Sequence, residues 1–197
     1  MNNKEDKRYT EETINEIAGH LKEVMRLLGE DVDREGLLKT PRRAAKALLY
    51  NTSGYTQDAD EVLNAAVFTH PGSEIVIVKN IEFYSLCEHH LLPFFGHVSV
   101  GYIPNGKIVG LSKIARVVDV FARRLQVQER FTDQLCDEIY KVLPTRGVIV
   151  ECEAHHMCMK MRGVEKQDTT TVTMQYRGEF EKSALRQEFY NLLERRK

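Results

Sequence analysis

Glu74-Ile75-Val76-Ile77-Val78, followed by Ile81, Phe83 and Tyr84, is a run of β-branched and aromatic residues that predicts a strand. A second strand is predicted from Phe94 to Ile103, ahead of the turn Pro104-Asn105-Gly106. Because the link between the two runs is short, we expect an antiparallel pair rather than a parallel crossover unit.

The residues that follow predict two helices and then two more strands. Ser112 and Thr132 are the predicted caps of helices with apolar residues at three- and four-residue spacing, and Pro144 ends the second helix. Strands return at Val148–Val150 and at Thr169–Tyr176, and Ser183 opens a last helix. The order ββααββ predicts an α+β domain in which two helices cover one face of an antiparallel four-stranded sheet. Open sheet edges favour self-association.

The first third of the chain reads as helical, so we expect an N-terminal helical region over residues 1–70 and a catalytic domain over residues 71–197. Apolar residues recur at helical spacing from Ile14 to Leu28, and Gly29 ends that pattern. Thr40-Pro41 predicts a second helix start, and Asp58 to Asn64 predicts a short helix.

The amino-acid composition excludes some classes of function. The 197 residues carry 28 Lys and Arg against 29 Asp and Glu, and the isoelectric point is near 6.7. This balance argues against a partner such as nucleic acid or a membrane surface. No apolar run approaches the roughly 18 residues of a membrane span, and Met1–Arg8 lacks the apolar core of a secretory signal. We expect a cytoplasmic protein, in which four cysteines are thiols or metal ligands.

Two clusters rich in cysteine and histidine predict a metal site: Cys87-Glu88-His89-His90 and His155-His156-Met157-Cys158. The Cys87-x-x-His90 spacing suits tetrahedral zinc, and the third ligand could be Cys152, His156 or Cys158. Cys136 lies among helix-face apolar residues and is predicted to be core. Three protein ligands would leave a position for an activated water, with His89 and His155 or His156 as proton shuttles. A four-ligand structural site that includes Cys152 is the alternative.

Cations at a helix start predict an anion site. Lys113 and Arg116 lie three residues apart on the first turn of the helix that Ser112 opens, where the helix dipole favours a bound phosphate. Arg162, Arg42 and Arg43 are further candidates. A glutamate within Gln126-Val127-Gln128-Glu129-Arg130 could accept the N–H groups of a guanine edge. Solvated helix faces and a plain polar loop are the alternatives.

These motifs together resemble the zinc-dependent GTP cyclohydrolase I family from about Thr10 to Phe180. The resemblance rests on four segments besides the cluster at Cys87: Thr40-Pro41-Arg42-Arg43, Gly110-Leu111-Ser112-Lys113, residues 124–130 and His156-Met157-Cys158-Met159 with Arg162-Gly163-Val164. It implies the tunnelling fold, a homodecamer with active sites between subunits, and hydrolysis of GTP to 7,8-dihydroneopterin triphosphate and formate, the first step of folate and pterin biosynthesis.

The resemblance also implies roles for individual residues. Zn²⁺ would be held by Cys87, His90 and Cys158, which leaves Cys152 in the core. His89 and His156 would transfer protons. The substrate-binding residues that it implies are Gln128 and Glu129 for guanine, with Ser112, Lys113, Arg116 and Arg162 for the triphosphate, and Arg42 is added as a further candidate.

Two rival interpretations stay open. One is a catalytically silent oligomer with structural zinc and the nucleotide as a regulator. The other is a related pterin enzyme of the tunnelling fold, although those with zinc usually use three histidines whereas this chain offers two cysteines.

Overall fold

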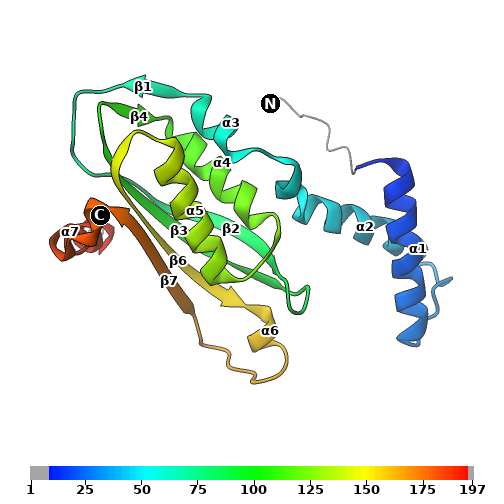
Figure 1. Ribbon diagram of the computed structural model, residues 1–197. Coiled ribbons are helices and arrows are strands. Elements are labelled where there is room, and N and C mark those ends of the chain that lie inside the picture. The colour runs from blue at the N-terminus through cyan, green and yellow to red at the C-terminus, as the bar shows by residue number, and fades with distance from the viewer. Residues whose placement is uncertain (1–8, 195–197) are drawn as a thin grey trace.

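The computed structural model describes residues 9–194 and shows an α+β architecture (Figure 1). Within this range, no helix is both long and apolar enough to cross a membrane. The segment Met1–Arg8, on which the expectation of a cytoplasmic protein partly depends, lies outside the described residues.

Four long strands form the antiparallel part of the main sheet: β2 (Val76–Cys87), β3 (Pro93–Pro104), β6 (Thr145–His156) and β7 (Thr171–Gly178). These are the four predicted strands, and the ββααββ order is confirmed. The sheet has one strand more than predicted, because the two-residue β5 (Leu125–Gln126) joins its edge in parallel with β2. A separate ribbon pairs β1 (Val67–Thr69) with β4 (Lys107–Val109).

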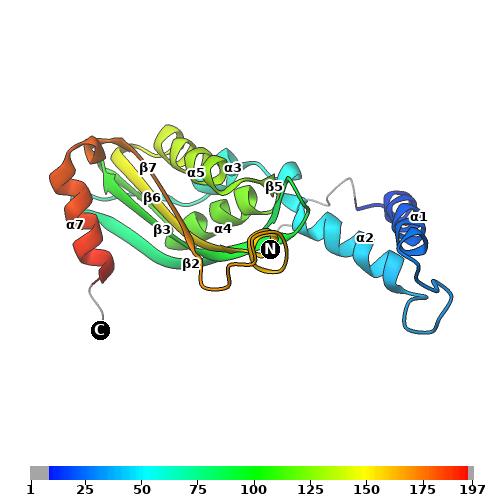
Figure 2. The same cartoon turned by 90° about the horizontal axis from the view of Figure 1, so that it is seen from below.

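Two helices, α4 (Leu111–Ala122) and α5 (Gln128–Val142), lie on one face of this sheet (Figures 1 and 2). Their apolar faces pack on alternate residues of the strands, and the fully buried core between the layers includes Phe83, Phe94, Val117, Phe131 and Val150. This alternation is the expected pattern of a sheet that buries one face against helices.

The predicted starts of both helices were wrong. The cap of α4 is Gly110, so Ser112 lies inside the first turn and caps nothing. Helix α5 begins four residues before Thr132, which is fully buried and donates from Oγ1 to the carbonyl of Gln128 at 2.8 Å. A threonine bonded to the fourth preceding carbonyl is a helix-interior residue, and its position in the sequence does not distinguish this from a cap.

The opposite face of the sheet is covered at one end by α7 (Ser183–Glu194), the helix predicted from Ser183 (Figure 2). Phe189 of α7 and Phe180 of the preceding turn η2 (Glu179–Glu181) are fully buried against Ile103 and Ile149. This second core is small, and it leaves the rest of that face to polar side chains such as Glu153.

The N-terminal helices form a third cluster. Helix α1 (Glu11–Leu27) packs on α2 (Thr40–Asn51) through Ile14, Ala45 and Leu49. The turn η1 (Ser53–Thr56) leads to the short α3 (Ala59–Asn64), which Asp58 caps and whose Leu63 belongs to the main core. The division of the chain at residue 70 stays a prediction, and α3 and β1 before it pack with the elements after it.

Candidate metal centre and active site

Three side chains from two distant parts of the chain converge at one end of the sheet. Cys87 is the last residue of β2, His90 follows in the turn, and Cys158 lies in the one-turn helix α6 (Met157–Lys160) after β6. Each offers one ligand atom, and these atoms all lie within 4.8 Å of one another. They are brought together because β2 and β6 both pair with β3 in antiparallel fashion, so the two strands finish at the same end of the sheet.

The geometry of this cluster suits zinc. Cys87 Sγ lies 3.8 Å from His90 Nδ1, and ligand atoms around a tetrahedral zinc ion lie about 3.5 to 3.8 Å apart. Burial raises the pKa of the Cys158 thiol, and the neighbouring Cys87 raises it further. A thiol whose ionisation is opposed by burial and by a neighbouring sulfur favours a cation beside it, because a bound metal ion stabilises the thiolate.

The other two cysteines lie in the core. Cys152 and Cys136 are fully buried, and burial raises the pKa of each thiol to about 12. Cys152 lies beside the hydroxyl groups of Thr132 and Thr173. No cysteine forms a disulfide bond within the described residues. Of the third-ligand candidates, only Cys158 joins the cluster with Cys87 and His90 among the residues that the structure describes.

The first turn of α5 is held against the turn that carries Cys87 and His90. Gln126 of β5 pairs with Cys87 of β2, and Glu88 N–H donates to the Gln126 carbonyl at 3.0 Å. Residues 128–130 therefore begin the helix beside the cluster, not in the loop that the sequence predicts. Glu129 is exposed there, and its carboxylate is free to face a ligand.

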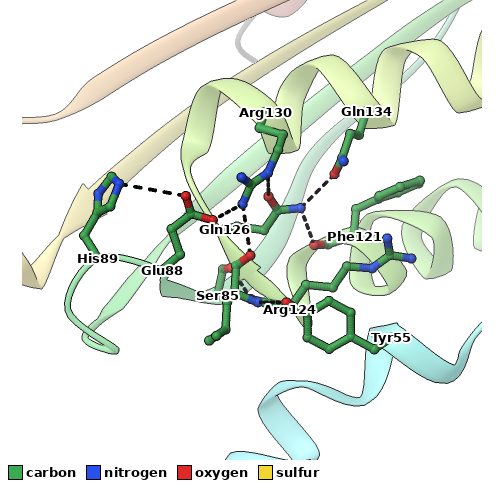
Figure 3. A network of polar contacts seen from close by, with 10 residues as sticks. Tyr55, Ser85, Glu88, His89, Phe121, Arg124, Gln126, Arg130 and Gln134 are labelled. Atoms are coloured by element: carbon green, nitrogen blue, oxygen red, sulfur yellow. Dashed lines mark hydrogen bonds and ion pairs between the residues drawn. The ribbon is translucent and has the colours of Figure 1, made fainter.

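Glu88 and Arg130 link these two segments directly (Figure 3). Arg130 Nη2 donates to Glu88 Oε2, while Arg130 Nε donates to Gln126 Oε1 at 3.0 Å. The bond to Arg130 lowers the pKa of the Glu88 carboxyl group, which stays ionised. Its other oxygen lies 3.8 Å from His89 Nε2, so the same carboxylate faces a predicted proton-transfer residue.

His156 is the last residue of β6 and is held on two sides. Its ring stacks on Phe94, with ring centroids 4.8 Å apart and planes 2° from parallel. Its Nε2 atom lies 2.7 Å from Gln128 Oε1. Burial lowers the pKa of His156, an effect that the negative charge of Glu129 partly offsets. His155 points to the other face of the strand and contacts Phe95 instead.

Arg162 reaches the cluster, since its Nη1 atom lies 3.0 Å from His90 Nε2. The other predicted phosphate-binding residues, Ser112, Lys113 and Arg116, do not. They lie at the start of α4, next to Val109, whose N–H donates to the hydroxyl of Tyr102.

That position is far from the metal cluster. Tyr102 pairs with Val76, the first residue of β2, whereas Cys87 is the last. The start of α4 and the metal cluster are thus separated by the length of β2, about 35 Å for twelve residues. Figure 1 shows the same separation between β4 and α6.

Arg42 lies on α2 and is engaged by α1. It donates to both carboxylate oxygens of Glu11, at 2.8 and 2.6 Å, and to Asn15 Oδ1 at 2.9 Å. The structure does not bring it to the metal cluster.

Sequence reasoning assigned no role to Glu88 and Arg130. A signal for this contact was present in the sequence. Each of the two residues lies in a short motif with predicted site residues, and Glu88 and Arg130 carry opposite charges. A pattern of residue types does not show that two motifs touch, and the pairing of β5 with β2 is the fact that was missing.

The α+β fold thus places a Cys-His-Cys cluster that could hold a metal ion beside a half-buried histidine, which defines the class as a protein with a candidate metal centre at one end of its sheet. A family model described as GTP cyclohydrolase I matches residues 17–194. The chain therefore belongs to the GTP cyclohydrolase I family, a family of hydrolases, which confirms the resemblance.

Curated relatives agree with this assignment. GTP cyclohydrolase 1 of Porphyromonas gingivalis is 56% identical over 187 residues, which are 95% of this chain and 97% of that protein. GTP cyclohydrolase 1 of Parabacteroides distasonis is 57% identical over 178 residues, 90% and 91% of the two chains. The protein of the same name from Bacteroides fragilis is 55% identical over 183 residues, 93% and 94% of the two chains.

Among solved structures, the chain is similar to one described as the archaeosine synthase QueF-Like in the apo form. The TM-score is 0.44 at 18% identity, and the match covers 54% of this chain and 96% of that one.

Proposed function

We propose that this chain hydrolyses GTP to 7,8-dihydroneopterin triphosphate and formate at the Cys87, His90 and Cys158 cluster, as the first step of folate and pterin biosynthesis. The observation that carries the proposal is the convergence of these three ligand atoms within 4.8 Å in a member of the GTP cyclohydrolase I family. Zinc bound there would act as a Lewis acid and activate the water that attacks C8 of the purine.

The first turn of α5 is the proposed guanine site. The exposed carboxylate of Glu129 can accept two N–H groups of a guanine edge. Gln128 is 1% exposed as a whole residue and its side-chain amide is bonded within the protein, so the guanine contact that the resemblance implies for it is not made by that amide in this conformation. The first N–H groups of a helix have no partner within the helix, and they are available to a ligand.

Proton transfer is assigned to His89 and His156. Burial lowers the pKa of His156, so at neutral pH its ring is neutral and able to accept a proton. His89 is exposed, and its Nε2 atom lies 3.8 Å from Glu88 Oε1, so the imidazole is oriented toward a carboxylate and open to a ligand.

The triphosphate site is proposed to form between subunits. Arg162 lies at the metal cluster, whereas Ser112, Lys113 and Arg116 lie a strand length away in the same chain. These groups can hold one substrate only if a second copy of the chain brings its α4 start to the cluster. The open edges of the sheet, strands β5 and β7, support such an assembly, which we propose to be a homodecamer. Arg42 remains a proposed further contact.

The free thiols of the described cysteines support a reducing compartment, and we propose the cytoplasm. The silent-oligomer alternative has the same metal cluster but no turnover. Zinc-loaded protein is incubated with GTP, formate is assayed, and the product is oxidised and tested for pterin fluorescence. Formate and pterin in equal amounts support the proposal, and GTP recovered unchanged by protein with full zinc occupancy contradicts it.

A further inference from the structure

We propose that Gln128 is a positioning residue that holds the neutral ring of His156 as the tautomer with its hydrogen on Nε2. The other ring nitrogen, Nδ1, is then the atom that can accept a proton. The catalytic use of that atom rests on the proposed function, whereas the tautomer itself is a property of this chain and is tested without substrate.

The orientation of the Gln128 amide is fixed by its surroundings. Its Nε2 atom lies 3.0 Å from the main-chain oxygen of Cys152 and 2.9 Å from that of Thr171. Carbonyl oxygens only accept hydrogen bonds, so the amide NH₂ group must face them. The reversed amide would place its oxygen against both carbonyls in a buried site, and only one of its NH₂ hydrogens could find a new acceptor, His156 Nε2.

Two threonine hydroxyl groups also favour this orientation of the Gln128 amide. The hydroxyl of Thr132 donates to the Gln128 carbonyl at 2.8 Å. Because its one hydrogen is used there, the 2.7 Å contact between Thr132 and Thr173 requires Thr173 to be the donor. Thr173 Oγ1, 3.1 Å from Gln128 Nε2, is thus a third acceptor for the amide and offers no hydrogen to a reversed one.

The tautomer of His156 follows from this arrangement. With the NH₂ group facing the strands, Gln128 Oε1 is the atom 2.7 Å from His156 Nε2. An amide oxygen cannot donate, so the hydrogen between them belongs to the imidazole. A neutral imidazole carries one N–H, which leaves the lone pair on Nδ1. The stacked ring of Phe94 keeps the imidazole in the plane that this bond requires.

Gln128 and Thr132 are buried and Thr173 is half-buried, and their hydrogen bonds join α5 to β6 and β7 beside His156. This polar cluster thereby sets which nitrogen of His156 carries the hydrogen. If the tautomer of a proton-transfer histidine were not fixed, the nitrogen facing the substrate would already carry a hydrogen in part of the molecules. With the tautomer fixed, that nitrogen can accept a proton in every molecule.

Neutron diffraction on zinc-loaded, substrate-free crystals exchanged into heavy water reads the tautomer directly. At about pH 8, where the imidazole is neutral, we expect a deuteron on His156 Nε2, none on Nδ1, and both amide deuterons of Gln128 directed at the strand carbonyls. A deuteron on Nδ1, alone or with a second one, overturns the proposal.

Steady-state kinetics test whether the hydrogen bond between Gln128 and His156 affects kcat. In Gln128→Met we expect kcat to fall about 10- to 100-fold, with the KM for GTP changed less than about two-fold. Added to His156→Ala, the same change should cost less than about two-fold more, because Gln128 acts through the missing ring. Gln175→Met, the same substitution on β7, should keep kcat within about two-fold.

Two results would overturn the positioning role: unchanged kcat in Gln128→Met, or losses that multiply in the double variant. If the wild-type protein does not turn over GTP, the proposed function fails, and the position of the deuteron still decides the tautomer. If Gln128→Met does not fold, the neutron measurement on the wild-type protein remains decisive.

Discussion

Arg130, in the first turn of α5, donates to the carboxylate of Glu88, which stands between the metal-cluster residues Cys87 and His90 (Figure 3). One ion pair therefore ties the turn that carries two predicted ligands to the helix that carries the predicted base-binding residue. Both side chains are partly exposed, at 41% for Arg130 and 32% for Glu88, so their effect on stability is small. At the site, the ion pair fixes the distance between the turn that carries Cys87 and His90 and the first turn of α5.

Arg130→Met is expected to lower zinc affinity or kcat about 10- to 100-fold, as loss of a group that orients metal ligands does. The free energy of unfolding should fall by less than about 1 kcal/mol. Zinc titration, GTP kinetics and urea denaturation measure the three quantities. Arg26→Met, which breaks the surface pair with Glu23 on α1, is the control and should leave zinc affinity and kcat unchanged. Equal behaviour of the two variants would refute a role for the Glu88 contact at the site.

Cys158→Ser should lose zinc and activity together, because a serine hydroxyl is a poor substitute for a thiolate ligand. Metal content after gel filtration and formate release measure both. Cys152→Ala is the matched control. It should keep its zinc, since Cys152 lies in the core and outside the cluster. Full turnover with stoichiometric zinc in Cys158→Ser would refute the ligand assignment, and a metal-free Cys152→Ala protein would indicate a four-ligand structural site.

Glu129→Ala should lower kcat/KM for GTP about 10- to 150-fold while zinc stays bound, because the carboxylate is assigned to the base and not to the metal. Loss of a charge-assisted contact costs about 1.5 to 3 kcal/mol in substrate binding or transition-state stabilisation. Steady-state kinetics and metal analysis on one preparation separate the two effects. Glu181→Ala, on the exposed turn before α7, is the control. Unchanged kinetics in Glu129→Ala would contradict the proposed guanine site.

The stability of the folded chain should depend on pH through Glu138 of α5. Burial, together with the hydrogen bond to Asp60 of α3 and its negative charge, raises the pKa of Glu138 to about 7, against the opposing effect of Lys141. Arg124 also faces this group. Between the ordinary pKa of a glutamate, 4.5, and about 7, Glu138 binds a proton more often in the folded state than in the unfolded state. This contribution to stability is therefore greatest at low pH, and it is lost as the pH rises through that window.

Glu138→Gln keeps a donor toward Asp60 and removes the charge, so it should raise the melting temperature more at about pH 8 than at about pH 5. Thermal denaturation of zinc-loaded protein at both values measures this difference. Glu181→Gln, an exposed carboxyl on the turn before α7, is the control. A gain that is equal at the two pH values, or larger in acid, would contradict the raised pKa.

The elements could be predicted from the sequence because each carries a local signal. The β-branched run at Val76 and the alternation around Val172 and Met174 both predicted strands that the structure contains. That Cys87 and His90 lie close together was likewise predictable, since the two residues are one turn apart, and their role as metal ligands stays a prediction. Cys158 was one of three candidates, and strand parity alone could not select it, because β6 ends at His156 and the chain turns into α6.

What the sequence could not show was contact between segments. The sequence suggested that Gln128 binds the base, yet its amide donates to strand carbonyls 24 and 43 residues away. Helix starts were misplaced for a related reason. Thr132 has the residue type of a cap, and only its burial and its bond to Gln128 show that it lies within the helix.

Strand β5 has two residues, and their pairing with Leu86 and Cys87 is the whole of the parallel contact that aligns α5 with the metal-binding turn. A single residue inserted between Leu125 and Gln128 would turn the helix by about 100° relative to that turn. Glu129 and Gln128 would then face away from Cys87 and His156, although every side chain of the site would still be present. Natural variation in the length of this segment is therefore expected to be absent among active relatives, whereas substitutions within it are tolerated wherever the backbone pairing survives.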